Sequence, residues 1–286
     1  MDERARWYKD LCFYRVFPRS FLDGNGDGIG DLWGLKDRLD YIQSLQADGI
    51  WLSSVCPSMN RDIGRDVTDF CAVAEEYGGM EAFLALLEEL HRRGMKLILD
   101  LELSCTGTEH PWFRASEQGE KPYKYYYIWR PAGERGRAPN NWQNIYSESA
   151  WSWSGERKAY YLHLQGENQP DLNMRNPEVR AEIKKIMRFW LDLGVDGFRE
   201  DRLNLISKPK ELPEGLPLWP LRRGSRHYDR GPFLRSYLQE FRHDVLDRYN
   251  CLTVGDLGSV GAQEARDYAD EPDGELDLVL HRDYFR

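Results

Sequence analysis

The stretch Gly197-Phe198-Arg199-Glu200-Asp201 decides the fold, because it follows a strongly amphipathic segment that ends at a glycine. Its position predicts a buried strand of an α/β fold. Successive side chains on a strand alternate between faces, so Arg199 and Asp201 point to one face while Phe198 and Glu200 point to the other. An arginine two residues from a carboxylate on the same face keeps that carboxylate ionised and oriented. The pattern predicts either a structural ion pair or an aimed carboxylate at the end of a strand.

The segments on both sides of this strand alternate between strand and helix signals. Short apolar runs predict further strands over residues 11–17, 49–52, 96–103, 252–256 and 277–281. Apolar residues at helical spacing predict helices over residues 35–45, 81–93, 176–194 and 232–249. Such an alternation is typical of a parallel sheet whose strands are connected by helices.

A long segment interrupts this alternation between residues 105 and 173. It is rich in Gly, Pro and Trp and shows no regular period. A structureless connection of this length is uncommon in a compact domain, so the segment is predicted to be an inserted subdomain. The chain then divides into a first part of the barrel (1–104), the insertion (105–173) and a continuation of the barrel (174–286).

A cation-binding pattern lies early in the chain. Oxygen-bearing side chains stand at positions 1, 3, 5 and 9 of a glycine-rich loop, as Asp23, Asn25, Asp27 and Asp31, and the carbonyl of Ile29 stands at position 7. Oxygen ligands in this register surround a hard cation such as Ca²⁺. The alternative is a Gly/Asp turn without a ligand. The loop differs from an EF-hand, because a strand precedes it and no glutamate stands at position 12.

Composition limits the classes of partner. The net charge of −9 argues against nucleic acid and an anionic membrane surface. No apolar run reaches the length of a membrane span, and the polar start does not resemble a signal peptide. The five cysteines are widely spaced, which fits free thiols in a reducing cytoplasm.

Several motifs in matching order resemble one known family. The motifs are residues 12–21, the loop from Asp23 to Asp31, Gln169-Pro170-Asp171-Leu172-Asn173, Gly197-Phe198-Arg199-Glu200-Asp201 and Thr253-Val254-Gly255-Asp256. Together they resemble the α-amylase family of glycoside hydrolases (family 13), and most closely its oligo-1,6-glucosidase and α-glucosidase branch. The Gln-Pro-Asp-Leu-Asn run is a marker of that branch.

The resemblance implies a (β/α)8 TIM-type barrel with a subdomain inserted after strand 3. It also implies retaining hydrolysis of terminal α-glucosidic bonds in short α-linked gluco-oligosaccharides. Asp201 matches the nucleophile, Arg199 its partner, and Asp66 a ligand of a sugar hydroxyl. The loop that begins at Asp23 matches the family's calcium site. The chain carries about six of the barrel's strands, so the barrel is expected to be incomplete.

The departures from the family pattern lie where the chemistry is expected. Asp256 stands at the acid/base position, where the family has Glu, and the family's third catalytic Asp lies beyond the sixth strand. Arg65 replaces an aromatic sugar platform, and Cys105 replaces a histidine. Retaining hydrolysis needs its two carboxyl groups about 5–5.5 Å apart, and a misplacement of about 1 Å can lower the rate about 10²-fold. We therefore expect weak or absent turnover; the alternative is a non-catalytic, truncated relative with weak sugar or protein binding.

Two structural expectations follow from the strand pattern. Alternation places Glu200 and Arg202 on the helix-covered face, where an unpaired charge is unfavourable, so Arg202 is expected to pair with Glu200 or Glu102. An incomplete barrel leaves unpaired edges on its first and last strands. Such edges recruit other chains, and self-association through them is expected.

Overall fold

A computed structural model describes residues 7–216, 222–258, 260–269 and 274–280. Its main feature is a six-stranded parallel sheet that curls into half of a barrel. In spatial order the strands are β1 (Phe13–Val16), β2 (Gly49–Leu52), β3 (Lys96–Glu102), β7 (Gly197–Asp201), β8 (Leu252–Gly255) and β9 (Leu278–Val279). The fold predicted from sequence, an incomplete (β/α)8 barrel, is confirmed.

The register between β3 and β7 positions the candidate site. Asp100 lies opposite Arg199, and Glu102 lies opposite Asp201. Residues paired across parallel strands point to the same face, so these four side chains share the concave face of the sheet. Since both strands run in the same direction, Glu102 and Asp201 meet at the same carboxyl edge.

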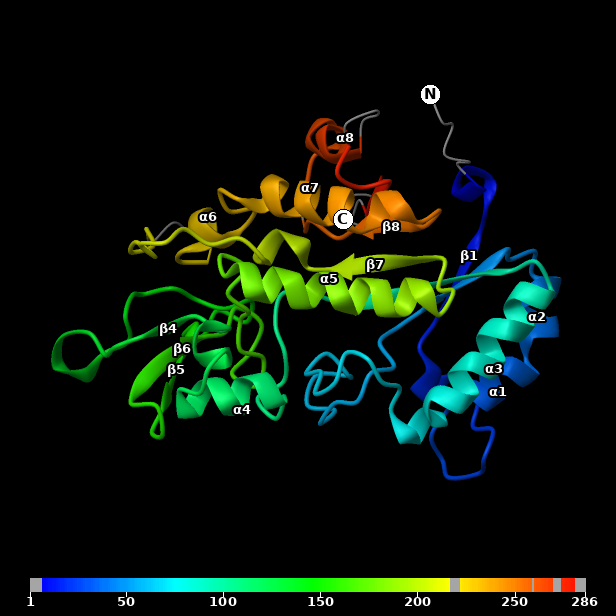
Figure 1. Cartoon of the computed structure of the whole chain (residues 1–286), viewed down its shortest axis with the longest axis horizontal. Helices are drawn as coiled ribbons and strands as arrows, with labels where there is room; N and C mark the ends of the chain where they lie inside the picture. Colours follow the sequence, from blue (N-terminus) through cyan, green and yellow to red (C-terminus); the bar gives the residue numbers. More distant parts are fainter. Residues whose placement is uncertain (1–6, 217–221, 259, 270–273, 281–286) are drawn as a thin grey trace.

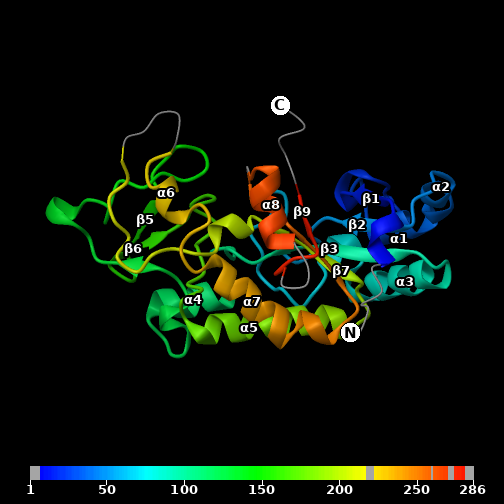
Figure 2. The same cartoon turned by 90° about the horizontal axis from the view of Figure 1, so that it is seen from above.

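Helices connect the strands and cover the outer face of the sheet. They are α1 (Leu32–Asp37), α2 (Leu39–Ser44), α3 (Gly79–Arg92), α5 (Pro177–Asp192), α7 (Leu234–Asp244) and α8 (Ala262–Ala269). The short α6 (Ser225–Tyr228) lies instead against the inserted segment, where Tyr228 packs beside Trp142. Helices α1, α2 and α3 gather at one end of the molecule, while α5 and α7 cover its middle (Figures 1 and 2). Ion pairs of Arg180 and Lys184 with Glu240 connect α5 to α7.

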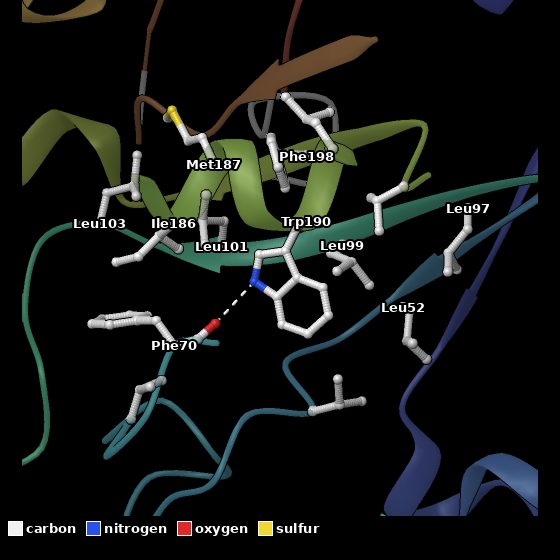
Figure 3. Packing of buried hydrophobic residues seen from close by; sticks show 14 of the residues in the cluster. Leu52, Phe70, Leu97, Leu99, Leu101, Leu103, Ile186, Met187, Trp190 and Phe198 are labelled. Carbon is white, nitrogen blue, oxygen red and sulfur yellow. Dashed lines mark hydrogen bonds between the residues drawn. The ribbon is translucent and has the colours of Figure 1, made fainter. Parts of the chain in front are cut away.

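The apolar face of α5 closes the core between the sheet and the helices. Trp190 is 1% exposed and meets the ring of Phe83 edge-to-face at 5.1 Å. Its indole N–H donates a 2.9 Å hydrogen bond to the carbonyl of Phe70, which satisfies the one polar atom of a fully buried side chain (Figure 3). Leu99 and Leu101 of β3 lie against the same cluster. Truncating a buried aromatic side chain of this kind typically costs about 3–5 kcal/mol.

The segment between β3 and α5 forms a small structure of its own. It contains α4 (Pro111–Gln118) and a three-stranded antiparallel sheet of β4 (Trp129–Arg130), β6 (Ala159–Leu162) and β5 (Trp151–Ser154). It lies at the end of the molecule opposite α1–α3 (Figure 1). A second buried cluster around Trp142 and Trp151 supports it.

Most predicted elements differ by a few residues at their ends, and two differ in ways that have a clear local reason or limit. The helix expected over residues 35–45 is two short helices, because Arg38 leaves helical geometry at φ −107° and ψ 12°. It also begins earlier, since the Asp31 carboxylate accepts the backbone N–H of Gly34 and caps α1. The strand expected over residues 277–281 covers Leu278–Val279, and its end at residue 281 lies outside the described residues.

Candidate active site

A cavity of about 420 Å³ opens at the carboxyl edge of the strands. Its charged lining consists of three acids, Asp100, Glu102 and Asp201, and two arginines, Arg15 and Arg65. Convergent carboxylates in a cavity at the carboxyl ends of parallel strands are the usual position of catalytic groups in barrel enzymes. This cavity is therefore the candidate active site.

Arg199 lies beneath the cavity and connects its carboxylates. Its guanidinium lies 2.7 Å from Asp201 Oδ1 and 3.6 Å from Asp100 Oδ1, and it donates a hydrogen bond to Asp256 Oδ2. Burial works to lower the pKa of Arg199, but the charges of Asp201, Asp100 and Asp256 more than offset it and raise that pKa. Arg199 is therefore a permanent cation that holds three acids in place.

Asp201 is the carboxylate that the arginines hold most directly. It is 4% exposed, yet it lines the cavity. Arg65 Nε lies 3.2 Å from its Oδ2, on the side away from Arg199. Two flanking guanidinium groups fix the direction of this carboxylate, and an oriented carboxylate is what a covalent nucleophile requires. The shared face of Arg199 and Asp201, predicted from strand alternation, is confirmed.

Asp256 is oriented differently from Asp201. Its Oδ2 accepts from Arg199 and its Oδ1 accepts the backbone N–H of Gly258 at 3.1 Å. It is 1% exposed and does not contribute to the cavity lining. Both carboxylate oxygens of Asp256 are therefore engaged, one by Arg199 and one by the backbone of Gly258.

Glu102 is a site residue whose role was not predicted from sequence. Its side chain lines the cavity, and its Oε1 accepts from Ser104 Oγ at 2.7 Å. Ser104 Oγ in turn accepts from Gln165 at 2.7 Å. Burial and the neighbouring Asp201 charge raise the pKa of Glu102 to about 7. Its signal in the sequence was the alternation of charged Asp100 and Glu102 with leucines at the end of the strand.

The predicted ion pair of Arg202 with Glu200 or Glu102 is wrong. Arg202 adopts a left-handed conformation (φ 51°) directly after β7, so the strand alternation no longer governs its direction. Its Nε lies 4.0 Å from Asp201 Oδ2 instead. Glu200 stays buried on the outer face, where burial and the charge of Asp277 raise its pKa to about 8. Protonation, not an ion pair, removes the buried charge there.

Two further residues predicted from the resemblance lie outside the cavity lining. Asp66 is 1% exposed, and its Oδ2 accepts the backbone N–H of Arg61 at 3.3 Å. Cys105 is fully buried and accepts a 3.4 Å hydrogen bond from Gln165. The structure thus brings Asp201, Arg199, Asp256 and Arg65 into one network, while Asp66 and Cys105 lie beneath the surface of the site. Their role in sugar binding stays a prediction.

The glycine-rich loop after β1 offers oxygen ligands but does not gather all of them. Asp23 accepts three backbone N–H groups, which lower its pKa, and Asn25 donates to Asp27 Oδ2 at 3.0 Å. Asp31 faces inward and accepts two backbone N–H groups. Within the described ranges, no three His, Cys, Asp or Glu side chains are grouped as metal ligands. The oxygens of Asp23 and Asp27 are engaged within the loop, by backbone N–H groups and by Asn25, and a calcium site here stays a prediction.

The half-barrel and its carboxylate-lined cavity define the class of this protein. Residues 15–283 match the family described as α-amylase, catalytic domain. The chain belongs to the α-amylase family, as the motifs predicted.

Its curated relatives include oligo-1,6-glucosidases. The oligo-1,6-glucosidase of Parageobacillus thermoglucosidasius is 46% identical over 277 residues, which cover 96% of this chain and 49% of that protein. The enzyme of the same name from Halalkalibacterium halodurans is 44% identical, with 96% and 50% covered. The chain thus spans about half the length of the curated relatives that it matches.

A solved structure shows the same fold. The trehalose-6-phosphate hydrolase of Bacillus licheniformis superposes with a TM-score of 0.92 at 38% identity, over 96% of this chain and 49% of that one. In the part of the chain that the structure covers, no helix combines the length and the apolar character needed to cross a bilayer.

Proposed function

We propose that the chain carries a glycoside hydrolase site of the retaining type, specific for terminal α-glucosidic bonds in short α-linked gluco-oligosaccharides, with weak turnover. The observation that carries this proposal is Asp201, which lines the cavity at the end of β7 between Arg199 and Arg65. The substrate class comes from the names of the oligo-1,6-glucosidase relatives.

In the proposed reaction an Asp201 oxygen attacks the anomeric carbon, and the bond from that carbon to the leaving oxygen breaks. The resulting glycosyl ester is hydrolysed by water, which restores the carboxylate. Arg199, 2.7 Å from Asp201 Oδ1, fixes the direction of the carboxylate throughout. The leaving oxygen needs a proton, and the group that donates it decides the rate.

Proton donation is the step that we expect to be slow. Asp256, at the family's acid/base position, is bound to Arg199 and absent from the cavity lining. Its side chain is one carbon–carbon bond shorter than Glu, and about 1 Å of misplacement can cost about 10²-fold in rate. Arg65 adds a second obstacle, because a sugar must displace or accommodate it beside Asp201.

A non-catalytic sugar- or protein-binding role is the second candidate. It is favoured by the same Arg65, which pairs with Asp201 and so occupies the carboxylate that would attack. In this case sugar binds without bond cleavage, and binding does not depend on the charge of Asp201.

Release of nitrophenol from 4-nitrophenyl α-glucoside tests the proposal. We expect slow release by the purified chain and none by Asp201→Ala, with Asp37→Ala, an exposed aspartate at the end of α1, behaving as the original chain. Equal rates for the chain and Asp201→Ala would reject catalysis at this site. In that case, glucoside binding measured by calorimetry would support the non-catalytic role.

Two further properties belong to this proposal. Calcium at the loop from Asp23 to Asp31 would have a structural role, since the loop does not line the cavity. All five cysteines are free, which supports a reducing compartment such as the cytoplasm.

A further inference from the structure

A second and larger cavity, of about 580 Å³, lies away from the candidate active site. It is bounded by the inserted segment, by the residues just before α5 and by the loop after β7. It shares no lining residue with the cavity beside Asp201. Whatever it binds therefore does not need to contact the proposed nucleophile.

The charged side chains that line this cavity are all positive. Its eighteen described lining residues include six cations and no acid. The whole chain carries a net charge of −9, so the positive charge of this cavity is opposite in sign to the net charge of the chain. Lys208 is neutralised by a buried ion pair with Asp171, which leaves five cations: Arg130, Arg157, Lys158, Arg175 and Lys210.

Two of the five are half-buried guanidinium groups without a carboxylate partner among the described residues. Arg130 donates to the carbonyls of Trp129 and Lys210, each at 2.9 Å. Arg157 donates to the carbonyls of Ser116 and Lys124 and lies over the Trp129 ring. Burial and the nearby charge of Arg175 lower the pKa of Arg130, and burial lowers the pKa of Arg157. Both groups are thus partly desolvated cations that lack a counter-ion.

The other three cations are exposed and line the same cavity. Lys158, Arg175 and Lys210 form no ion pair with any residue that the structure places. The acids nearest in sequence, Glu156 and Glu211, are exposed and do not contribute to the lining. Exposed lysines on a flat surface are commonly solvated. Here Lys158, Arg175 and Lys210 line a concave site together with two partly desolvated arginines.

We propose that this cavity is a binding site for a phosphate group, either of a small organic phosphate such as a sugar phosphate or of free phosphate. A dianionic phosphate supplies the counter-charge that the five cations lack, and guanidinium groups match its oxygens in pairs. The volume lies within the range of small-molecule sites, about 300–1,000 Å³. The cavity also offers the exposed ring of Tyr125 and the amide of Asn173 to the rest of such a ligand.

Isothermal titration with glucose 6-phosphate, inorganic phosphate and glucose at low salt tests this site. We expect both phosphates to bind and glucose not to bind. Arg175→Gln/Lys210→Gln should weaken glucose 6-phosphate binding at least about tenfold, as expected for the loss of charged contacts of about 1.4 kcal/mol in total. Lys9→Gln/Arg137→Gln removes one exposed lysine and one exposed arginine elsewhere and should leave the affinity unchanged.

Comparing the affinities for glucose 6-phosphate and inorganic phosphate distinguishes the source of the phosphate group. Tighter binding of glucose 6-phosphate than of inorganic phosphate assigns the site to a sugar phosphate, while equal affinities assign it to phosphate itself; both support the proposal. Absence of phosphate binding, or equal weakening in both double variants with folded circular dichroism spectra, would overturn it. Asp201→Ala should bind phosphate normally, which separates this result from the fate of the proposed catalysis.

Discussion

Arg199 is the residue on which the candidate site depends most, because two buried carboxylates, Asp201 and Asp256, and the partly buried Asp100 surround it. Arg199→Met would leave these acids without their common cation, and breaking a buried pair in this way typically costs about 3–5 kcal/mol. We expect a corresponding fall in the midpoint of urea unfolding, with Arg199→Lys losing less. An Arg199→Met midpoint equal to that of the original chain would show that the network does not support the fold.

Glu200 makes stability depend on pH. Its pKa in the folded chain is about 8, above its ordinary value of 4.5, so the folded state keeps a proton that the unfolded state releases. The stabilisation is complete below about pH 4.5 and is lost as the pH rises to about 8. Glu200→Gln should flatten this profile by an amount on the order of 5 kcal/mol. Glu178→Gln, at an exposed position in α5, should keep the original slope; an unchanged slope in Glu200→Gln would contradict this account.

For single residues, the sequence predicts which side chains of one strand share a face. Alternation along β7 correctly placed Arg199 and Asp201 together, because the strand has only two faces. It could not place Glu102 beside Asp201, since that neighbour depends on the register between strands far apart in sequence. It also misplaced Arg202, where a positive φ ends the alternation.

Among the elements, the loop from Asp23 to Asp31 carries the calcium prediction. An ion that binds only the folded state raises the thermal midpoint by mass action. We expect calcium to raise the midpoint of the chain and Asp27→Ala to abolish that rise. Asp37→Ala is the matched control and should respond to calcium as the original chain does. Identical melting curves with calcium and with a chelator would reject the site.

Element positions were predicted better than element boundaries. Strands β2 and β7 coincide with their predicted ranges, since each begins at a glycine shortly after the end of a helix. The break between α1 and α2 was missed, because the apolar spacing continues through Arg38 while the backbone does not. The phosphate cavity could not be predicted at all: it joins residues from Arg130 to Lys210, which only the folded chain brings together.

For the whole molecule, the half-barrel predicts self-association. Within the described residues, β1 pairs only with β2 and β9 only with β8, so both edges present unpaired backbone groups. We expect light scattering to show a mass that rises with concentration. Phe13→Lys on β1 should reduce this rise, and Phe233→Lys, 42% exposed before α7, should not. A monomer at all concentrations would contradict this expectation.

The central claim is that Asp201 is a glycosidase nucleophile whose weakness lies in proton donation to the leaving group. A 5-fluoro-α-glucosyl fluoride separates the two steps, because fluoride leaves with little help from an acid. The bond from the anomeric carbon to fluoride breaks as the bond to an Asp201 oxygen forms, and the trapped ester is read by mass spectrometry of the digested chain. We predict one fluoroglucosyl group on the peptide that contains Asp201 and none in Asp201→Ala. An unlabelled chain, or equal labelling of Asp201→Ala, would contradict the claim.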